Sequence, residues 1–314
     1  MRIAVLDDYQ RAARRFADWD GLGAEVVFLH DHLGDTDAVT AALDGFDVVV
    51  AMRERTPFTA ERLEALPALR LLVTTGMGNA SIDMTAARRL GITVCGTGIL
   101  PHATAELTWG LILSLTRHIH EEAAGMRQGA WQRTVGGDLA GRTLGIVGLG
   151  NLGGRVAAVG AAFGMRMVAW STHLDPARAA EHGVTAVDKR ELFSTSDIVT
   201  VHYKLSERSI GLIGAQELSW MKPTALLVNT SRGPIVDTPA LVEALHQGRI
   251  AGAALDVYDT EPLPVEDPLR DLPHTLLTPH IGYVTEATYD VFYREAVEDI
   301  AAYRNGTPLR VLNP

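Results

Sequence analysis

Residues 144–153 of the chain read Leu144-Gly145-Ile146-Val147-Gly148-Leu149-Gly150-Asn151-Leu152-Gly153. The first four residues are typical of a buried strand, and the alanine-rich segment 154–163 that follows is typical of a helix. In the spacing G-x-G-x-x-G, Gly148 permits a tight turn, Gly150 lets the backbone approach a pyrophosphate, and Gly153 allows close helix–strand packing. Unpaired N–H groups at the start of the helix attract the anion. The stretch therefore predicts a dinucleotide-binding turn.

Short apolar runs alternate with amphipathic segments on both sides of this turn. The runs rich in Val, Ile and Leu lie at 3–6, 26–29, 48–51, 69–73, 92–94, 143–147, 167–170, 198–202, 225–229, 252–257 and 275–277. Continuous apolar strands separated by helices are typical of parallel sheets covered on both faces. We therefore expect an α/β protein with two doubly wound domains. One comprises residues 1–98 together with 286–314, and the other comprises residues 99–285.

A long helix is predicted over residues 103–126, because the segment has no proline and carries repeated apolar residues. At more than about 20 residues it exceeds the usual helix length. We interpret it as a connector between domains or as a face of an oligomer. A loop containing several glycines follows at residues 127–140.

Composition narrows the possible classes of protein. A chain of 314 residues and 33.8 kDa is long enough for about two domains. It has 28 Lys and Arg against 38 Asp and Glu, and a net charge of −10 disfavours nucleic-acid and anionic-membrane partners. The lone cysteine, Cys95, excludes an intramolecular disulfide and fits a cytoplasmic location. No apolar run approaches the roughly 20 residues of a membrane span.

The strand after the glycine turn ends without the acid that usually binds the ribose 2′-hydroxyl. Residues 167–170 are followed by Ser171 and Thr172, whose hydroxyls can donate hydrogen bonds to either form of the ribose. The nearest acid, Asp175, precedes Pro176 and is better explained as the N-cap of a helix. The choice between NAD and NADP stays open.

Three polar residues follow other predicted strands of the same domain. They are Arg232, Glu261 and His280. Taken singly, they fit a surface arginine in a salt bridge, a solvated loop acid and a hydrogen-bonded, half-buried histidine. Taken together, they fit proton transfer to a 2-oxo acid. A guanidinium grips a carboxylate, imidazole supplies a proton, and a neighbouring carboxylate stabilises the imidazolium.

With these motifs in place, the chain resembles the D-isomer specific 2-hydroxyacid dehydrogenase family. The matching motifs are the turn 148–153, NTSRGPIVD at 229–237, ALDVYDTEP at 254–262 and TPHIG at 278–282. Residues 74–83 and 104–106 match more loosely, and the resemblance covers essentially the whole chain. It implies a Rossmann dinucleotide-binding domain and a flavodoxin-like substrate domain.

The resemblance also implies roles for individual residues. Arg232 binds substrate, His280 is the acid–base residue, and Glu261 pairs with it. Contacts to the cofactor are implied for Thr104, Asp256, Gly148, Gly150, Asn151, Leu152, Gly153, Ser171 and Thr172, and contacts to the substrate for Arg53, Thr75, Gly76, Met77 and Gly78. The departure from the family is Ser171, which stands in the place of the usual acid. No metal is expected.

The expected function is hydride transfer between NAD(P)H and C2 of a small 2-oxo acid, of the glyoxylate or hydroxypyruvate reductase type, in a cleft between the domains. The resemblance is to a family in which members of this type are dimers, so we expect a homodimer that uses the helix from Ala103.

Two alternatives stay open. One is a phosphoglycerate dehydrogenase-like enzyme, which we expect less because the chain stops at Pro314 without room for a regulatory domain. The other is a non-catalytic NADH-sensing protein. Formate dehydrogenase relatives have a glutamine where this chain has Glu261, so Glu261 argues against formate dehydrogenase activity.

Overall fold

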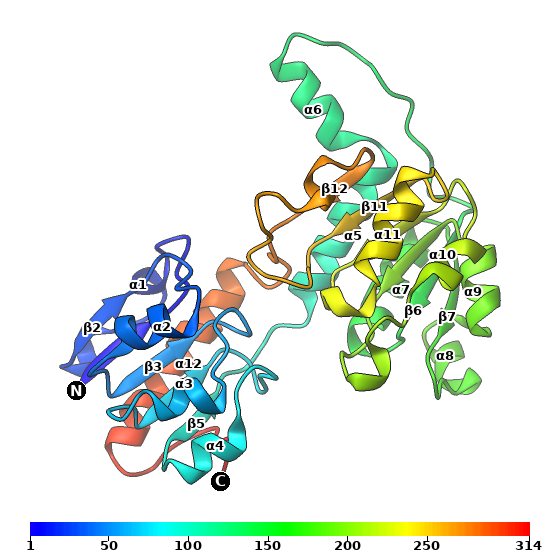
Figure 1. Ribbon diagram of the computed structural model, residues 1–314. Helices are drawn as coiled ribbons and strands as arrows, with labels where there is room; N and C mark the ends of the chain where they lie inside the picture. The colour runs from blue at the N-terminus through cyan, green and yellow to red at the C-terminus, as the bar shows by residue number, and fades with distance from the viewer. The chain divides into compact units, whose positions relative to one another are not determined.

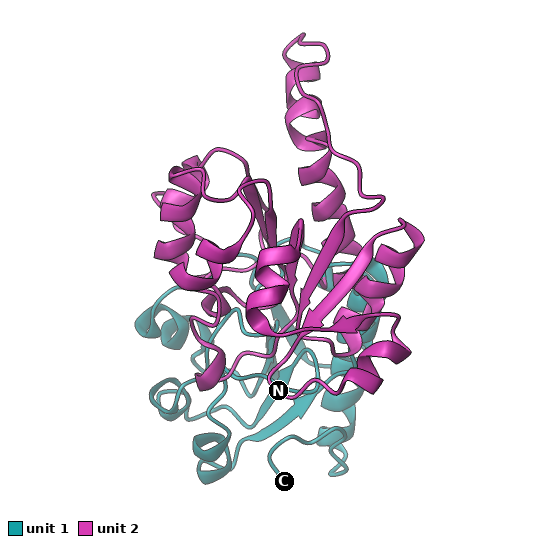
Figure 2. Cartoon of the chain, turned by 90° about the vertical axis from the view of Figure 1, so that its right-hand side faces the viewer, with its two compact units in different colours: residues 1–100, 284–314 teal, residues 101–283 magenta.

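The computed structural model describes residues 1–314 and divides the chain into two compact units. Unit 1 comprises residues 1–100 and 284–314, and unit 2 comprises residues 101–283 (Figure 2). The boundaries expected from the sequence, after residues 98 and 285, lie two residues from these. Unit 1 is therefore discontinuous in sequence, whereas unit 2 is one continuous segment.

Unit 1 contains a five-stranded parallel sheet in the order β2-β1-β3-β4-β5 (Figure 1). The strands are β1 Arg2–Val5, β2 Glu25–Phe28, β3 Val48–Ala51, β4 Leu71–Thr74 and β5 Thr93–Gly96. β3 and β4 are buried along their whole length, which explains their unbroken apolar sequence. The order matches the predicted flavodoxin-like arrangement, in which ligands bind beyond the carboxyl ends of the strands.

Unit 1 has five α-helices, and all but α1 begin after a residue whose side chain caps them. They are α1 Ala13–Phe16, α2 Thr36–Leu43, α3 Ala60–Glu64, α4 Met84–Arg89 and α12 Glu286–Arg304, with a short 3₁₀ helix η1 at Asp20–Leu22. Side chains of Asp35, Thr59, Asp83 and Thr285 accept N–H groups of the first turns. As expected, the last helix packs on unit 1, and it buries Tyr289, Phe292 and Tyr293 there.

The residues after α12 cover the outer edge of β5. Val311 forms an antiparallel bridge with Cys95, and Leu312 donates its N–H to the carbonyl of Val94 at 2.8 Å. The side chain of Asn313 accepts from the N–H of Val94 and donates to the carbonyl of Ile92, as a neighbouring strand does. An edge strand that is covered in this way cannot pair with another chain.

Unit 2 contains a seven-stranded parallel sheet in the order β12-β11-β10-β9-β6-β7-β8. The strands are β6 Thr143–Val147, β7 Arg166–Trp170, β8 Thr185–Ala186, β9 Ile198–Val201, β10 Leu226–Asn229, β11 Gly252–Leu255 and β12 Thr275–Leu277. Counted from β6, this is the Rossmann order with one further strand, and the strand order reverses beside β6. The two predicted doubly wound parallel sheets are confirmed.

The helices of unit 2 lie over both faces of this sheet, except for α6, which projects from the unit (Figure 1). They are α5 His102–Thr116, α6 Ile119–Arg127, α7 Asn151–Ala162, α8 Pro176–Glu181, α9 Lys189–Thr195, α10 Ala215–Trp220 and α11 Thr238–His246, with 3₁₀ helices η2 Glu207–Ser209, η3 Gly233–Ile235 and η4 Pro268–Asp271. None of the protein's helices combines the length and apolar character needed to span a membrane.

The prediction of a single long helix over residues 103–126 is wrong, because the chain forms two helices there, α5 and α6. His118 lies between them in a left-handed conformation with φ 53°. Asn, Asp and His adopt this conformation more readily than other non-glycine residues. The apolar residues Trp109, Ile112 and Leu115 of α5 are buried within unit 2, so α5 does not present the uncovered apolar face expected for it.

Candidate active site

The glycine turn between β6 and α7 has the geometry of a phosphate-binding loop. Gly148 has φ 96°, and a Cβ there would lie 2.7 Å from the carbonyl oxygen of His202. A Cβ on Gly153 would collide with the carbonyl oxygen of Gly148, whereas the space beside Gly150 is open. Gly150 is the N-cap residue of α7, and it has no side chain that could accept the first N–H groups of the helix. The N–H groups of Asn151, Leu152 and Gly153 are therefore left for an anion. The turn therefore fits a dinucleotide pyrophosphate.

Ser171 and Thr172 lie next to this turn, at the carboxyl end of β7. The Ser171 hydroxyl accepts a hydrogen bond from the N–H of Leu149 at 3.2 Å, which brings the first residue after β7 against the glycine turn. The Thr172 hydroxyl lies 2.6 Å from the hydroxyl of Tyr203. Asp175 accepts the N–H of Ala177 as the N-cap of α8, with Pro176 following it, so the predicted capping role is confirmed.

Glu261 and His280 meet beyond the carboxyl ends of β11 and β12. The Nδ1 atom of His280 lies 2.5 Å from Oε2 of Glu261, and the other carboxylate oxygen accepts the N–H of Tyr258 at 2.9 Å. Both side chains are partly exposed, at 16% for His280 and 25% for Glu261. The carboxylate therefore fixes the ring at Nδ1 and leaves Nε2 as the atom that can exchange a proton with a ligand.

Asp256 holds the segment that carries His280. Its carboxylate accepts hydrogen bonds from the Thr278 hydroxyl at 2.6 Å, the Ile281 N–H at 2.9 Å and the Gly282 N–H at 2.8 Å. Burial raises the pKa of the Asp256 carboxyl, and the hydrogen bond from Thr278 partly offsets that rise. The His280 backbone has φ 51°, an uncommon conformation that these surrounding contacts stabilise.

Arg232 and Thr104 also belong to unit 2. Arg232 follows β10 and donates from Nη1 to the carbonyl of Ser231 at 2.7 Å, while its own carbonyl accepts from the side chain of Asn229. Thr104, in the first turn of α5, donates its hydroxyl to the carbonyl of Gly282 at 3.1 Å. Unit 2 thus gathers the predicted acid–base pair, Asp256 and Thr104 around the segment 278–282.

Arg53 and the loop Thr75-Gly76-Met77-Gly78 form a second polar region, at the carboxyl edge of the sheet in unit 1. Arg53 donates from Nη1 to the Thr75 carbonyl and from its backbone N–H to the Thr75 hydroxyl, both at 2.9 Å. Gly76 has φ 91°, and the Arg53 guanidinium occupies the place where a Cβ would stand. The N–H groups of Met77 and Gly78 make no hydrogen bond within the protein. Two adjacent backbone donors beside a cation can bind a carboxylate.

Sequence reasoning missed several side chains that support these residues. The Tyr258 hydroxyl donates to the carbonyls of Leu255 and Thr278, and therefore joins the ends of β11 and β12. Tyr203 stacks on Trp170, with ring centroids 6.0 Å apart. Tyr258 and Thr278 lie inside motifs already noted in the sequence. Their place inside those motifs, as residue types that can form hydrogen bonds, was the only signal in the sequence for a supporting role.

Comparison with known proteins agrees with this geometry. Residues 109–282 match the family model described as D-isomer specific 2-hydroxyacid dehydrogenase, NAD binding domain. The chain is 41% identical over 254 residues to a glyoxylate reductase of Aeropyrum pernix, which covers 78% of this chain and 76% of that protein. It is 37% identical to a D-3-phosphoglycerate dehydrogenase of Synechocystis sp., over 83% of this chain but 48% of that protein.

A solved structure shares the fold along almost the whole chain. The phosphoglycerate oxidoreductase of Vibrio cholerae O395 superposes with a TM-score of 0.94 at 37% sequence identity, covering 98% of this chain and 99% of that one. Family model, relatives and fold agree with the cofactor turn in unit 2. The chain belongs to the D-isomer specific 2-hydroxyacid dehydrogenase family of oxidoreductases.

Proposed function

We propose that this oxidoreductase reduces small 2-oxo acids to D-2-hydroxy acids, with glyoxylate and hydroxypyruvate as its preferred class of substrate and NADH or NADPH as its reductant. The observation that carries the proposal is the contact of 2.5 Å between Glu261 and His280 on the unit that contains the glycine turn. The similarity of the chain to glyoxylate reductases, at 38–41% identity, supports the same function.

The protein's residues handle the proton and the charge in this reaction. When bound, the reduced nicotinamide supplies a hydride to C2 of the substrate. His280 donates a proton from Nε2 to the carbonyl oxygen, while Glu261 holds Nδ1 and stabilises the imidazolium. Arg232 binds the substrate as a fork of donors and polarises the carbonyl. For the cofactor, we assign the pyrophosphate to the N–H groups of residues 151–153 and the nicotinamide to Asp256 and Thr104.

The substrate carboxylate is assigned to unit 1. The free N–H groups of Met77 and Gly78 and the guanidinium of Arg53 are suited to it. Arg53 already has Glu54 as a neighbour, with Nη2 and Oε1 3.5 Å apart. That carboxylate offsets part of the positive charge, which favours a substrate with one carboxylate over one that also carries a phosphate. This favours glyoxylate and hydroxypyruvate over the phosphorylated substrate of the phosphoglycerate dehydrogenase alternative.

The proposal is tested by screening 2-oxo acids with NADH and with NADPH. We expect glyoxylate or hydroxypyruvate to give the highest kcat/KM, and phosphohydroxypyruvate to give a lower value. A higher value for phosphohydroxypyruvate would establish the phosphoglycerate dehydrogenase alternative instead. NADH binding without turnover on any 2-oxo acid would establish the cofactor-sensing alternative.

The cofactor preference is expected to be weak, because Ser171 neither repels a 2′-phosphate nor grips a 2′-hydroxyl as an acid does. We expect kcat/KM for the two cofactors to differ by no more than about 100-fold, or ~2.7 kcal/mol. Replacing Ser171 with aspartate is expected to shift the ratio towards NADH, while still offering an acceptor to the Leu149 N–H. Steady-state kinetics with both cofactors measure the shift.

The matched control is Ser194→Asp, which adds the same charge at an exposed position of α9. It is expected to leave the cofactor ratio unchanged. If Ser171→Asp also leaves the ratio unchanged, Ser171 does not lie at the ribose. A wild-type preference for NADH beyond 100-fold would mean that another acid, such as Asp175, reaches the ribose.

We also propose that the protein is a homodimer that uses α6 and the loop after it. This arm projects from unit 2 in both ribbon views (Figures 1 and 2). It exposes Ile119, Met126, Trp131 and Val135 at 52%, 54%, 74% and 94%. Glu122 accepts from the Thr134 hydroxyl and from the N–H groups of Arg133 and Thr134, so the loop is tied to α6. An ordered arm with exposed apolar side chains fits a second copy of the chain.

Light scattering is expected to give twice the chain mass of 33.8 kDa at micromolar concentration. The double variant Trp131→Asp/Val135→Asp is expected to shift the mass to the monomer, because it places charges in the apolar surface. Val265→Asp, which changes another exposed valine of unit 2, is the control and is expected to stay dimeric. A wild-type mass of 33.8 kDa would exclude this dimer.

The protein is assigned to the cytoplasm. Its only cysteine, Cys95, is buried as a free thiol, and burial raises the pKa of that thiol to about 12. A chain without disulfides fits a reducing compartment, where NADH and NADPH are also present.

A further inference from the structure

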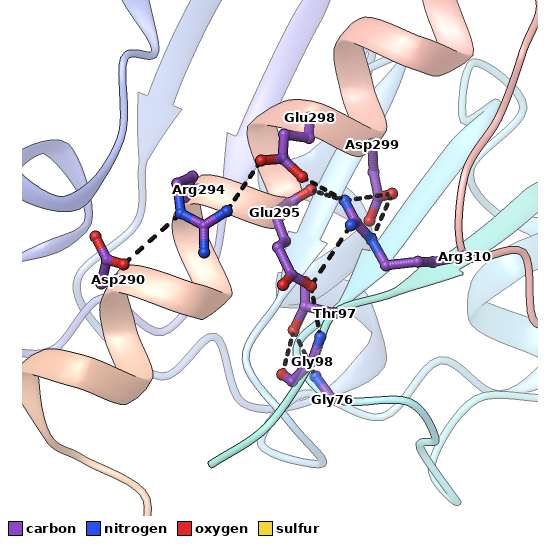
Figure 3. Close-up of polar contacts among 9 residues, drawn as sticks. All are labelled: Gly76, Thr97, Gly98, Asp290, Arg294, Glu295, Glu298, Asp299 and Arg310. Carbon is purple, nitrogen blue, oxygen red and sulfur yellow. Dashed lines mark hydrogen bonds and ion pairs between the residues drawn. The ribbon is translucent and has the colours of Figure 1, made fainter.

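The segment Thr97–Gly98, which follows β5 in unit 1, is joined to the substrate-side loop by a buried hydroxyl. Thr97 is fully buried, and its Oγ1 accepts the N–H of Gly76 at 2.8 Å. The same hydroxyl donates to the carbonyl of Gly98 at 3.1 Å. Figure 3 shows both bonds meeting at the Thr97 side chain. A single hydroxyl therefore satisfies two backbone groups on two different segments.

The backbone of β5 packs directly against the same loop. A Cβ on Gly96 would lie 2.7 Å from the carbonyl oxygen of Gly76 and 3.3 Å from the Cα of Met77. The Arg53 guanidinium fills the space where a Cβ on Gly76 would stand. Gly76 is thus held between the ends of β3 and β5, with its N–H already used by Thr97. Only the N–H groups of Met77 and Gly78 remain for a ligand.

Helix α12 holds the Thr97–Gly98 segment from the other side. The N–H of Gly98 donates to Oε2 of Glu295 at 2.7 Å, and Arg310 places Nη1 3.6 Å from the same oxygen. Arg310 also pairs with Asp299 and Glu298, at 3.0 and 3.1 Å (Figure 3). Burial raises the pKa of the Asp299 carboxyl to about 7, and the Arg310 charge opposes that rise. The segment is therefore bound to a helix that is itself cross-linked by ion pairs.

We propose that Thr97 is a positioning residue for 2-oxo acid reduction. Its hydroxyl fixes the direction of the Met77 and Gly78 N–H groups that receive the substrate carboxylate, and Glu295 supports it through Gly98. The proposal rests on the function proposed above. Without the hydroxyl, the buried N–H of Gly76 lacks its acceptor and the loop turns to find another. The loss falls on substrate binding, because the loop that Thr97 holds carries the N–H groups assigned to the substrate carboxylate and none of the proton-transfer residues.

The test compares Thr97→Val, which keeps the shape and removes the hydroxyl, with Thr97→Ser, which restores it. For Thr97→Val we expect KM for the best 2-oxo acid to rise about tenfold, as for loss of one buried hydrogen bond. We expect kcat to change less than threefold and KM for NADH to stay unchanged. Thr97→Ser is expected to return KM to within about twofold of wild type. Thr93→Val makes the same exchange earlier on β5 and is expected to change none of these values.

A binding measurement separates this proposal from the proposed function. Oxamate, a 2-oxo acid analogue that cannot be reduced, is titrated into the protein–NADH complex while NADH fluorescence is recorded. Weaker oxamate binding by Thr97→Val, with wild-type binding by Thr97→Ser, supports the positioning role. Unchanged KM and oxamate Kd in Thr97→Val overturn it while leaving the proposed function intact. Absence of turnover on every 2-oxo acid by the wild type overturns the proposed function, and this proposal with it.

A second variant covers the case in which Thr97→Val does not fold. Glu295→Leu leaves the Thr97 hydroxyl in place but frees the Gly98 N–H from α12. It is expected to weaken oxamate binding in the same direction and by less than Thr97→Val, with NADH affinity unchanged. Wild-type oxamate affinity in Glu295→Leu would contradict the support that the proposal assigns to α12.

Discussion

Replacing His280 with asparagine is expected to lower kcat/KM for 2-oxo acid reduction by about 10²–10⁴-fold, the usual contribution of a general acid. Cofactor affinity is expected to stay nearly unchanged, because the groups assigned to the cofactor are the glycine turn between β6 and α7, Asp256 and Thr104, none of which is altered. Asparagine is a suitable replacement because it tolerates the left-handed backbone, φ 51°, of this position. Steady-state kinetics and a fluorescence titration with NADH measure the two quantities.

His274→Asn is the matched control for this variant. His274 stands at the opposite end of β12, is exposed, and also has a left-handed backbone with φ 58°. Its replacement is expected to leave kcat/KM at the wild-type value. Wild-type turnover in His280→Asn would show that another group supplies the proton.

Replacing Glu261 with glutamine is expected to lower kcat/KM for 2-oxo acid reduction by about 10-fold or more, as for loss of one charged hydrogen bond. The reaction in the reducing direction needs the protonated imidazole, and a carboxylate 2.5 Å from Nδ1 stabilises that form. Glutamine is neutral and gives the ring a hydrogen bond without that charge, so part of the stabilisation is lost. Steady-state kinetics with the best 2-oxo acid measure the loss.

Glutamine keeps an acceptor for the Tyr258 N–H, so the loop around Glu261 is expected to hold its conformation. Glu266→Gln removes a charge from an exposed position of the same loop and is the control. Its kcat/KM is expected to match the wild type. Wild-type kcat/KM in Glu261→Gln would show that the carboxylate does not stabilise the imidazolium during turnover.

Local sequence patterns predicted the sheets and the cofactor turn because each depends on neighbouring residues. Four consecutive apolar residues, as in Val48–Ala51, predict a strand covered on both faces, and all four are buried in the structure. In the turn 148–153, Gly148 takes up a positive φ of 96°, and a Cβ on Gly153 would collide with the carbonyl oxygen of Gly148 five residues earlier. The capping role of Asp175 could likewise be predicted because Pro176 follows it directly. These features required no knowledge of distant contacts.

Features that depend on distant contacts were not predictable in this way. The break at His118 has no proline or glycine to mark it, and α6 buries almost none of its side chains. β8, at Thr185–Ala186, is too short to form a pattern. Asp256 binds Gly282 across 26 residues, and Gly76 meets Thr97 across 21. The motifs named the reacting groups, whereas the supporting hydrogen bonds became visible only in the folded chain.

The covering of β5 by residues 310–313 sets an order for folding during synthesis. A ribosome makes β1–β5 first, then the whole of unit 2, and only afterwards α12 and the residues that pair with β5. Unit 2 has all its strands on one continuous segment and can complete its core before the chain is finished. The sheet of unit 1 meanwhile presents an unpaired parallel edge to the cell. Until residues 310–313 emerge, the edge of β5 therefore stays open to pairing with a wrong strand.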